Sequence, residues 1–461
     1  MAPIEQYDAI IIGSGQSGGP LSTAFVASGK RTALVECIHI GGTCINEGCT
    51  PTKTMVASAR VAYLARRSAD YGVHTGPVSV NIQEVLARKQ KVVDSFREGS
   101  TRAIEAGGVD IVRGEARFLD PHTVRIDHSG GGTRELGAPL IVINTGCRPP
   151  TLPIDGIDAV PALNSTTIME VEELPEHLVI LGGGYVGLEF GQMFRRFGCE
   201  VTIVEQGPRL AAREDPEICE ALSKILSEDG IEVLLNSKVQ WVGGRAGEID
   251  VEVALQNGAK TVHCSHLLVA AGRTPNTDAL HPNDAGVETD SRGFVKANER
   301  LETSVPNIYA MGDVVACQPQ FTHISYDDFR ILRDNLLRGG DRTTRGRLVP
   351  YTVFTDPQLG RVGMTEQEAR KSGTNVKVAS MPMSHVARAL EVDEPRGVVR
   401  AVVDADSGQI LGASVLGLEG GEVMAMFEVA MMGKLPYSVL REGIFAHPTL
   451  AELMNNLFSG M

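Results

Sequence analysis

Two cysteines five positions apart, Cys44 and Cys49, lie in the stretch GGTCINEGCTPTK that runs from residue 41 to residue 53. Two thiols at this spacing could hold a metal ion, form a structural staple or exchange electrons. No second Cys or His pair at usable spacing lies nearby, which disfavours zinc, and the lone His39 is typical of a surface or packing residue. In the cytoplasm stable disulfides are rare, so a close pair there is more often catalytic or metal-binding than a staple.

The residues after the pair predict a helix. Residues 50–67 have helical character, with Pro51 in the first turn, where its missing N–H costs nothing. Cys49 would then lie at a helix N-terminus, which stabilises a thiolate and lowers the pKa of a thiol from about 8.5.

Two segments of the chain share one pattern. In each, an apolar strand is followed by a Gly-x-Gly-x-x-Gly set, a helix, a short β-rich segment and an acidic residue 23 positions after the first glycine. The members are Gly13, Gly15, Gly18 and Glu36 in the first segment, and Gly182, Gly184, Gly187 and Glu205 in the second.

This pattern is typical of dinucleotide binding. The first glycine makes a tight turn, the second lets the backbone approach a pyrophosphate, and the third allows close helix–strand packing. The helix N-terminus faces the phosphates, and the acid accepts from ribose hydroxyls. Two such sites indicate one flavin and one nicotinamide dinucleotide. Because Cys44 follows Glu36 by only eight residues, we expect the cysteine pair beside the first dinucleotide.

Composition limits the class of protein. A chain of 461 residues is expected to form two to four domains. Its net charge of -14 and the lack of a basic stripe disfavour nucleic-acid binding. No apolar run approaches the roughly 20 residues of a membrane span. The start MAPIEQYDAIIIG predicts a first β-strand rather than a signal peptide. We therefore expect a soluble cytoplasmic protein.

Several motifs, in one order, resemble a known family. They are GGTCINEGCTPTK, both glycine sets, INTGCRP (143–149), VAAGRTPN (269–276), IYAMGD (308–313), FTDPQLGRVG (354–363) and HPTLAE (447–452). The chain resembles, over nearly its whole length, the FAD-dependent pyridine nucleotide–disulfide oxidoreductases, which include lipoamide dehydrogenase, glutathione reductase and mercuric reductase. The implied fold is α/β, with two Rossmann-like dinucleotide-binding domains and a C-terminal α+β dimerisation domain.

The resemblance implies roles for individual residues. Gly13, Gly15, Gly18 and Glu36 would bind the adenosine half of FAD, Asp313 its ribityl chain, and Gly182, Gly184, Gly187 and Glu205 the nicotinamide nucleotide. Thr43, Gly146, Gly272 and Arg273 are further expected cofactor contacts. Cys49 would be the thiol that forms a charge-transfer pair with the flavin, and Cys44 the exchange thiol that attacks substrate. Lys53 would pair with Glu189 near the flavin, and Tyr185 resembles a mobile gate where nicotinamide stacks. For Lys53 and Glu189 the alternative is an exposed charge on a helix, and for Tyr185 it is an aromatic side chain that packs on its helix.

The C-terminal motif implies a homodimer. In the family, the histidine matching His447 comes from the partner subunit to face the exchange thiol, and the glutamate matching Glu452 orients it. An ordinary histidine titrates near 6.5, which suits proton transfer during thiol exchange. Residues 449–452 also read as a capping box at the start of a helix over TLAELMNNLF, which gives Glu452 a structural role as well.

The resemblance and the local patterns divide the chain into four parts. Residues 1–146 would form the first part of the FAD-binding domain, 147–275 the NAD(P)-binding domain, 276–340 the second FAD-binding or central part, and 341–461 the dimerisation domain. In the last part, two β-rich runs around residues 404–408 predict a hairpin, and EVMAMFEVAMMGK predicts an apolar helix whose methionines fill a core or an interface. The other six cysteines show no pairing pattern and are interpreted as structural thiols.

The substrate is the least determined feature. The segment from 320 to 337 and PYTVFTDP resemble a mercuric-reductase-like subgroup that includes the reactive-chlorine-resistance flavoprotein, which is credited with reducing metal ions such as copper. Mercuric reductases carry a second, C-terminal cysteine pair, whereas the last cysteine here is Cys317, which disfavours efficient mercury handling. Met381, Met383 and His385 would share one face of a strand and could touch soft metal, but an ordinary strand face is the favoured interpretation, and we predict no resident metal.

Three hypotheses on function follow. The first is an NAD(P)H-dependent reductase of a small disulfide, a thiol-reactive metal ion or an oxidant. The second is a dihydrolipoamide dehydrogenase. The third is a non-enzymatic flavoprotein that senses the nicotinamide pool, and intact Cys44, Cys49 and His447 argue against it.

The second site favours NADH over NADPH. The carboxylate of Glu205 can accept both ribose hydroxyls of NADH and would repel a 2′-phosphate. Arg209 and Arg213 follow it and could swing toward a phosphate, so NADPH stays open as the alternative.

Overall fold

The computed structural model describes residues 3–461. Contacts divide the chain into two compact units. The first contains residues up to 54, 84–150 and 272–347, and the second contains residues 55–83, 151–271 and 348–461. Each unit is described by itself below. The predicted α/β class with two Rossmann-like sheets is confirmed.

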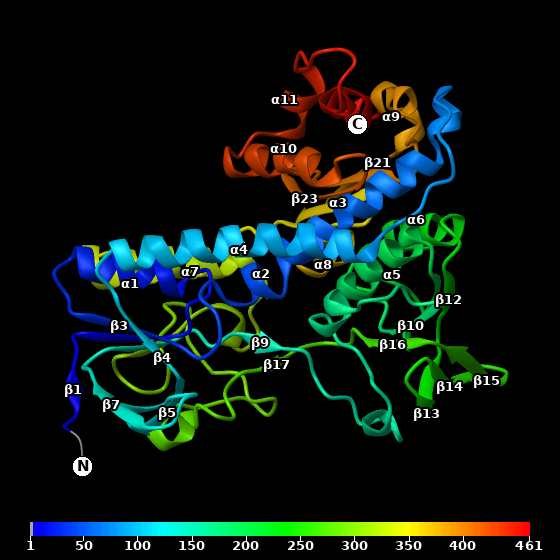
Figure 1. Ribbon diagram of the computed structural model, residues 1–461. Helices are drawn as coiled ribbons and strands as arrows, with labels where there is room; N and C mark the ends of the chain where they lie inside the picture. The colour runs from blue at the N-terminus through cyan, green and yellow to red at the C-terminus, as the bar shows by residue number, and fades with distance from the viewer. Residues whose placement is uncertain (1–2) are drawn as a thin grey trace. The chain divides into compact units, whose positions relative to one another are not determined.

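The first unit is built on a parallel sheet of five strands. Their order is β18-β8-β2-β3-β4. The chain therefore adds β3 and β4 on one side of β2, and then β8 and β18 on the other side. The strands are β2 (Ala9–Ile12), β3 (Thr32–Glu36), β4 (Asp110–Arg113), β8 (Ile141–Ile143) and β18 (Ile308–Ala310). Their short apolar runs are almost wholly buried, as expected for parallel strands that are covered on both faces. Helices α1 (Gly18–Ala27) and α7 (Thr322–Arg338) pack against each other over this sheet (Figure 1).

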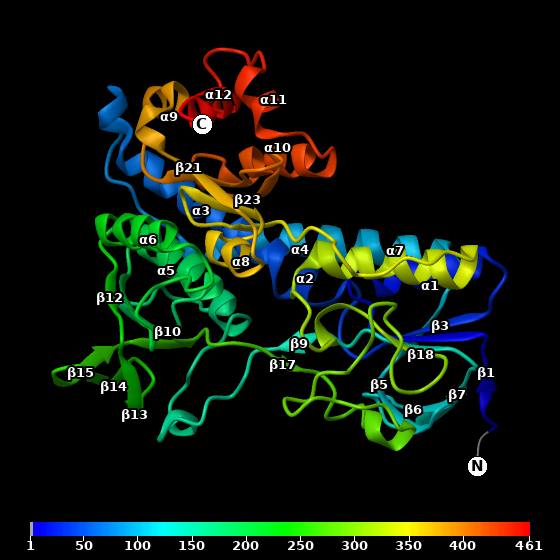
Figure 2. The ribbon, with the colours of Figure 1, turned by 180° about the vertical axis from the view of Figure 1, so that it is seen from behind.

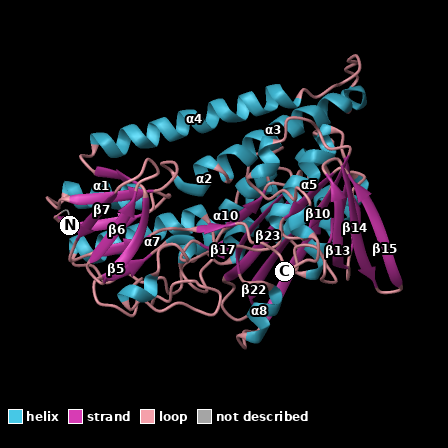
Figure 3. Ribbon diagram, turned by 60° about the horizontal axis from the view of Figure 1, so that its bottom comes forward, coloured by secondary structure: helices cyan, strands magenta, loops and turns pink. Residues whose placement is uncertain are grey.

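Smaller sheets and one long helix complete the first unit. Strands β1 (Glu5–Gln6), β7 (Thr133–Gly137), β6 (Thr123–Asp127) and β5 (Glu115–Asp120) form a four-stranded sheet, and β9 (Cys147–Arg148) pairs with β17 (Thr274–Pro275). Helix α4 (Ile82–Ala106) is the long helix of Figure 3 and belongs to this unit from residue 84 onward. Its Ile104 is buried in the same core as Leu21 and Phe25 of α1.

The cysteine stretch forms two helices. The predicted helix is α3, which spans Cys49–Arg66 and therefore begins one residue earlier than expected, at Cys49 itself. A short helix that the sequence did not predict, α2 (Gly42–Asn46), precedes it and carries Cys44. Gly41 and Gly42 both have positive φ, of 101° and 62°, so these glycines make the turn into α2.

The second unit contains another parallel sheet, with the order β12-β11-β10-β16. Its strands are β10 (His177–Leu181), β11 (Glu200–Val204), β12 (Glu232–Leu234) and β16 (His266–Val269), and its helices are α5 (Tyr185–Phe197) and α6 (Pro216–Glu228). An antiparallel sheet of β13 (Lys238–Arg245), β14 (Glu248–Leu255) and β15 (Gly258–Cys264) is attached to it.

The C-terminal part of the second unit is an antiparallel five-stranded sheet with helices. The order is β19 (Tyr351–Val353), β20 (Gln358–Gly363), β23 (Ile410–Gly417), β22 (Val398–Asp404) and β21 (Val376–Pro382). The predicted hairpin is the β22–β23 pair. The predicted apolar helix is α10 (Gly420–Met432), which packs on β20 and β23 (Figure 2). The remaining helices are α8 (Glu366–Lys371), α9 (Ala387–Glu391), α11 (Tyr437–Glu442) and α12 (Leu453–Phe458).

Methionines have two roles in this part. Met424 of α10 lies in the core, whereas Met432 at the end of the helix is 61% exposed. Met381 and Met383 are also core residues, and strand β21 ends at Pro382, so they do not share a strand face with the exposed His385. The predicted shared strand face is therefore not formed, and the two methionines are packing residues of the core.

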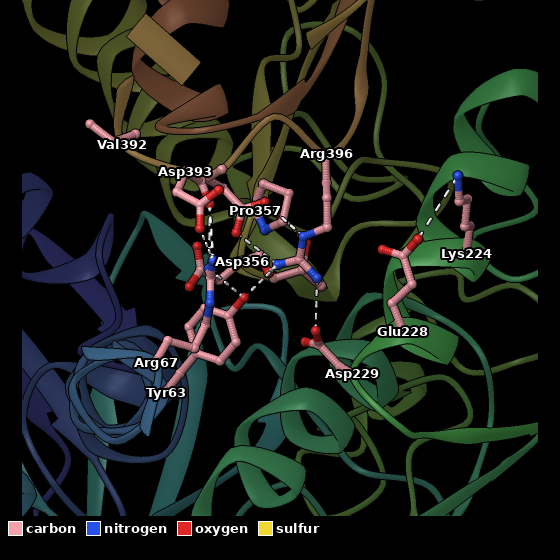
Figure 4. Close-up of polar contacts among 12 residues, drawn as sticks. Tyr63, Arg67, Lys224, Glu228, Asp229, Asp356, Pro357, Val392, Asp393 and Arg396 are labelled. Atoms are coloured by element: carbon pink, nitrogen blue, oxygen red, sulfur yellow. Dashed lines mark hydrogen bonds and ion pairs between the residues drawn. The ribbon is translucent and has the colours of Figure 1, made fainter. Parts of the chain in front are cut away.

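Three arginine side chains of the second unit surround the ring of Tyr63. The guanidinium groups of Arg196, Arg67 and Arg396 lie 3.8, 5.2 and 5.9 Å from the Tyr63 ring centroid. Arg396 also pairs with Asp229 at 2.8 Å, as Figure 4 shows. Cations at helix C-termini complement the helix dipole, so this network is explained by packing of the C-terminal ends of α3, α5 and α6.

Candidate dinucleotide and redox sites

The first glycine motif is closely packed against its own unit. Gly13 has φ of 104°, and a Cβ on it would lie 2.2 Å from the carbonyl oxygen of Asn144. The Asn144 side chain donates to the Gly13 carbonyl at 2.9 Å and accepts from Ser17 at 2.8 Å. Only glycine fits at this turn, because an L side chain would meet backbone atoms.

Glu36, the acid at the end of β3, is buried beside the glycine loop. One carboxylate oxygen accepts from the backbone N–H of Ser14 at 3.1 Å and from its hydroxyl at 2.6 Å. The other accepts from the N–H of Ile38 at 2.8 Å. The carboxylate is thus held in one orientation at the place where the motif expects a ribose.

The cysteine stretch lies against this same loop. A Cβ on Gly42 would come within 2.7 Å of the Gly15 Cα, and the Gly41 N–H donates to the Ser14 hydroxyl at 3.2 Å. Cys44 and Cys49 therefore lie beside the first glycine motif, as their sequence spacing predicted.

The two thiols interact with each other. The neighbouring Cys49 sulfur and then burial raise the pKa of Cys44, while the Lys53 ammonium has a weaker, opposite effect. Cys49 is the first residue of α3, and its sulfur lies 3.3 Å from the Thr322 hydroxyl. A pair with one thiol at a helix N-terminus and the other shielded beside it suits reversible disulfide exchange.

Asp313 lies just after β18 in the first unit. Burial raises the pKa of this carboxyl to about 6, and the Arg273 guanidinium opposes that rise. The preceding residue, Gly312, donates its N–H to the buried Asp328, which pairs with Arg347 at 2.6 Å. The thiol of Cys147 donates to the Asp313 carbonyl at 3.0 Å.

Three further expected cofactor contacts of the first unit lie in a short helix and in two turns. Thr43 is in α2, and Gly146 and Gly272 are turn glycines with φ of 65° and 89°. The Gly146 carbonyl accepts from Asn276 at 3.0 Å. The hydroxyl oxygen of Thr145 is buried without a hydrogen-bond partner in the described part of the chain. A glycine cradle with such a free polar atom fits a dinucleotide, and Gly13, Gly15, Gly18, Glu36 and Asp313 would hold FAD there.

The second glycine motif has the same backbone design. Gly182 has φ of 115°, and a Cβ on Gly187 would lie 2.1 Å from the Gly182 carbonyl oxygen. The carboxylate of Glu205 accepts from the N–H groups of Gly183 at 2.7 Å and Gly207 at 2.6 Å. Helix α5 begins at Tyr185, directly after Gly184, so its N-terminus is available for a pyrophosphate.

Glu189, in the second turn of α5, accepts from the N–H of Phe354 at 2.8 Å. Lys53 belongs to the first unit and Glu189 to the second, so their pairing stays a prediction.

His447 and Glu452 form a pair in the second unit. The His447 Nδ1 lies 2.8 Å from a Glu452 carboxylate oxygen, and the His447 side chain is 67% exposed. The predicted capping box is wrong. Thr449 makes no capping hydrogen bond and donates instead to the Ala446 carbonyl, and the Glu452 carboxylate pairs with the histidine. The segment begins as a short 3-10 turn over Leu450–Glu452, and α12 starts only at Leu453.

The six other cysteines are free thiols. Cys147, Cys199, Cys219 and Cys264 are buried, whereas Cys37 and Cys317 are exposed. Burial raises the pKa of Cys147, Cys199 and Cys264 to about 12, which keeps them protonated and unreactive near neutral pH. Across residues 3–461, no cluster of three or more His, Cys, Asp or Glu side chains has the arrangement of a metal site. Within the same residues, no helix has both the length and the apolar character needed to cross a bilayer.

Sequence reasoning missed residues that support the glycine loops. Ser14 and Ser17 occupy variable positions of the first motif, and Asn144 lies in the INTG stretch. Tyr351 and Glu214, which contact Tyr185, carry no local signal because they lie 166 and 29 residues away from it.

Comparison with known proteins defines the class. The sequence model of the pyridine nucleotide-disulphide oxidoreductases matches residues 7–328, and that of the dimerisation domain of the same proteins matches residues 349–458. The chain belongs to the pyridine nucleotide-disulphide oxidoreductase family. It is a flavoprotein oxidoreductase, and its cofactors are FAD and NAD(P)H.

Particular relatives narrow the comparison. The probable pyridine nucleotide-disulfide oxidoreductase RclA of Escherichia coli (strain K12) is 40% identical, covering 99% of both chains. The mercuric reductase of Lysinibacillus sphaericus is 32% identical over 97% of this chain and 81% of its own. The dihydrolipoyl dehydrogenase of Haloferax volcanii is 33% identical over 96% and 94%. The structure of the Cu(II) complex of the HOCl-induced flavoprotein disulfide reductase RclA from E. coli matches with a TM-score of 0.90 at 38% identity, over 99% of this chain and 100% of that one. The predicted mercuric-reductase-like subgroup is thereby confirmed, and this chain is an RclA-like flavoprotein disulfide reductase.

Proposed function

We propose that the protein transfers two electrons from NADH, through FAD and the Cys44–Cys49 pair, to a small disulfide, a thiol-reactive metal ion such as Cu(II) or Hg(II), or an oxidant. The observation that carries the proposal is the contact between the two thiols on the first glycine loop, with Cys49 at the start of α3. FAD, when bound, supplies the two-electron chemistry that links the nicotinamide to the thiols.

The cysteines perform the exchange with substrate. Cys44 gives its proton to an imidazole base, and its sulfur then attacks one sulfur of the substrate disulfide and releases the first thiolate product. Cys49 then attacks the Cys44 sulfur, forms the Cys44–Cys49 disulfide and releases the second product. The balance is one NADH, one proton and one disulfide consumed for one NAD⁺ and two thiols formed. Protons reach the departing thiolates from an imidazole, and His447, oriented by Glu452, is the group proposed for this step.

The roles assigned to the other cofactor residues and the four-part division of the chain belong to the same proposal, as does a cytoplasmic location. We also propose a homodimer in which His447 completes the site of a second copy. Exposed apolar side chains support this: Val429 and Met432 of α10, Val439 of α11 and the fully exposed Ile444 precede His447 in the dimerisation domain.

Replacing Cys44 with Ser tests the redox assignment. The variant should lose disulfide turnover, keep its FAD and show the long-wavelength absorbance of a thiolate–flavin pair from Cys49. Turnover with NADH of lipoamide, low-molecular-weight disulfides, Hg(II), Cu(II) and quinones identifies the acceptor class. Reduction of disulfides by Cys44→Ser at the wild-type rate would refute the assignment.

Mixing two inactive dimers tests the shared site. Cys44→Ser and His447→Ala homodimers should each be inactive, but exchange of subunits creates one complete site if His447 acts across the dimer. Recovery of activity on mixing is the expected result, and no recovery in verified heterodimers would place His447 in the site of its own chain.

A dihydrolipoamide dehydrogenase is the second candidate. The His447–Glu452 pair and the similarity to dihydrolipoyl dehydrogenases favour it. Fast oxidation of dihydrolipoamide with NAD⁺, set against slow turnover of every other acceptor, would establish it. A purely sensing flavoprotein would show no turnover and no thiolate–flavin absorbance after anaerobic reduction with NADH.

A further inference from the structure

A buried carboxylate of α7 lies behind the turn that carries Asp313 and has no role in the steps above. Asp328 is 0% exposed. One of its oxygens accepts from the backbone N–H of Gly312 at 2.9 Å, and the other accepts from the Arg347 guanidinium at 2.6 Å. A carboxylate inside a protein is costly unless hydrogen bonds and a counter-charge compensate it. Packing alone therefore does not explain an acid at this position.

The turn that Asp328 contacts lies directly on α7. It is a short 3-10 turn, Gly312–Val314, with Asp313 at its centre. Gly312 has φ of 73°, and a Cβ on it would lie 2.8 Å from the Ser325 hydroxyl oxygen of α7. The hydrogen bond from Gly312 to Asp328 therefore fixes the peptide group from which the turn starts, one residue before Asp313.

The same face of α7 also contacts the first glycine loop. Ser325 lies three residues before Asp328, so the two side chains are neighbours on the helix surface. The Ser325 hydroxyl lies 2.7 Å from the hydroxyl of Ser17 in the glycine loop. One helix is thus tied to the loop where the pyrophosphate of FAD is expected and to the turn where its ribityl chain is expected, and it fixes the separation between them.

Arg347 favours the charged form of Asp328 and orients it. The Arg347 side chain is 13% exposed, and its other terminal nitrogen donates to the Gln318 side-chain oxygen at 2.8 Å. Burial raises the pKa of Asp328, whereas the charge and the hydrogen bond of Arg347 oppose that rise. The carboxylate is therefore held between an anchored cation on one side and the backbone of the turn on the other.

We propose that Asp328, held by Arg347, is a positioning residue that sets the conformation of the Asp313 turn for the ribityl chain of FAD. The inference rests on the proposed role of Asp313 as the residue that contacts this chain. Asp328 acts through the N–H of Gly312, so the turn has its binding conformation before the cofactor arrives. Such preorganisation strengthens binding because the turn does not have to be ordered by the ligand.

Two uncharged double variants separate the contact with the turn from the ion pair. The amide pair, Asp328→Asn with Arg347→Gln, keeps an acceptor oxygen for the Gly312 N–H. The apolar pair, Asp328→Leu with Arg347→Met, removes that acceptor and leaves no unpaired charge in the interior, so we expect it to fold. The measurement is the dissociation constant of FAD, followed by flavin fluorescence as FAD is added to the FAD-free chain. The apolar pair should bind FAD at least about tenfold more weakly than the amide pair, a difference of ~1.4 kcal/mol.

Binding of ADP separates positioning from a general loss of structure. ADP contains the half of FAD that is expected on the first glycine motif and lacks the ribityl chain, so both double variants should bind ADP as the wild type does. The melting temperatures of the two FAD-free variants should also be similar. Asp334→Ala is the matched control, because it removes another acid of α7, one that pairs with Arg342 at 3.0 Å, and it should leave the affinity for FAD unchanged.

Three results would overturn the inference: equal affinity of the two double variants for FAD, an equal loss of ADP and FAD binding in the apolar pair, or a tenfold loss of FAD affinity in the amide pair. The last result needs only the amide pair, so the inference can be refuted even if the apolar pair does not fold. Asp313→Ala tests the premise separately. If that variant bound FAD like the wild type, the proposed role of Asp313 would be wrong, whatever the Asp328 variants show.

Discussion

The two glycine motifs have the same spacing but hold their acids differently. Glu36 in the first motif is buried and accepts three hydrogen bonds, one of them from the Ser14 hydroxyl. Glu205 in the second motif is only half-buried and accepts two, both from backbone N–H groups. The first acid is therefore part of the interior, whereas the second keeps part of its surface for solvent or for a nucleotide that comes and goes.

The supports beneath the two loops differ in the same way. The first loop rests on a buried polar cluster in which Ser17 contacts both Asn144 and Ser325, and the cysteine stretch covers it through Gly42. The second loop is held by the hydrogen bond from the Ala211 N–H to the Gly183 carbonyl, and Tyr185 is the first helical residue after it. We infer that the first motif is built for a resident cofactor and the second for an exchanging one, which is what an enzyme that keeps FAD and releases NAD⁺ requires.

We expect the largest effect on cofactor binding from replacing one glycine of each motif with alanine. In Gly13→Ala the new Cβ would lie 2.2 Å from the Asn144 carbonyl oxygen, at a φ of 104°. We expect FAD affinity to fall by more than about 100-fold, which is ~3 kcal/mol. In Gly187→Ala the Cβ would lie 2.1 Å from the Gly182 carbonyl oxygen, and FAD should stay bound while reduction by NADH is lost. Flavin absorbance after gel filtration and anaerobic reduction measure the two outcomes.

Gly99→Ala in α4 is the control for this comparison, because nothing lies within 4 Å of its Cβ. It should bind FAD like the wild type. If Gly187→Ala lost FAD as completely as Gly13→Ala does, the two sites would not be separable.

A smaller difference should follow from removing the acids. Glu36→Ala leaves the N–H and the hydroxyl of the buried Ser14 without their acceptor, so we expect a loss of about 2–4 kcal/mol in the free energy of unfolding. Glu205→Ala should cost about 1 kcal/mol or less, because its carboxylate is only half-buried and water can take its place as the acceptor. Urea unfolding followed by circular dichroism measures both, and equal losses would remove the distinction between a buried and an open acid.

The stability of the FAD-free protein should depend on pH through Asp313 of the first site. Burial raises the pKa of Asp313 to about 6 from 3.8 in the unfolded chain. Its contribution to stability is therefore fully present below pH 3.8 and is lost as the pH rises through 6. Asp313→Asn should stabilise the FAD-free protein by about 1–2 kcal/mol at pH 8, after allowance for its partial exposure, and should give no gain near pH 4. Thermal melting at the two pH values checks the sign, and a gain of the same size at both would mean that Asp313 titrates normally.

Local spacing predicted the parts of this design that depend on neighbours in the chain. The 23-residue interval gave both dinucleotide motifs, and Pro51 marked the start of α3 to within one residue. The short helix around Cys44 was not predicted, because it depends on positive φ at Gly41 and Gly42 and on packing against Gly15.

Long-range partners were beyond the reach of the sequence. Asn144 reaches the first glycine loop across 131 residues, and Tyr351 reaches Glu214 across 137. Glu452 shows that a local sequence pattern can also mislead. A local pattern predicted a capping box, but the carboxylate had a competing partner in His447, whose side chain a helix rule does not consider.

The preference for NADH over NADPH should be the smallest effect, and it depends on the partial exposure of Glu205. Both of its oxygens are oriented by backbone N–H groups, and their remaining lone pairs can accept the two ribose hydroxyls of NADH. The same charge would repel a 2′-phosphate, whereas Arg209 and Arg213 are exposed and could attract one. We predict that the wild type favours NADH and that Glu205→Ala narrows the gap mainly by relieving repulsion of NADPH. Ratios of kcat/KM for the two nucleotides measure this. A wild type that prefers NADPH tenfold, worth about 1.4 kcal/mol, would mean that the arginines dominate. It would also mean that an open acid at this motif does not select the nucleotide.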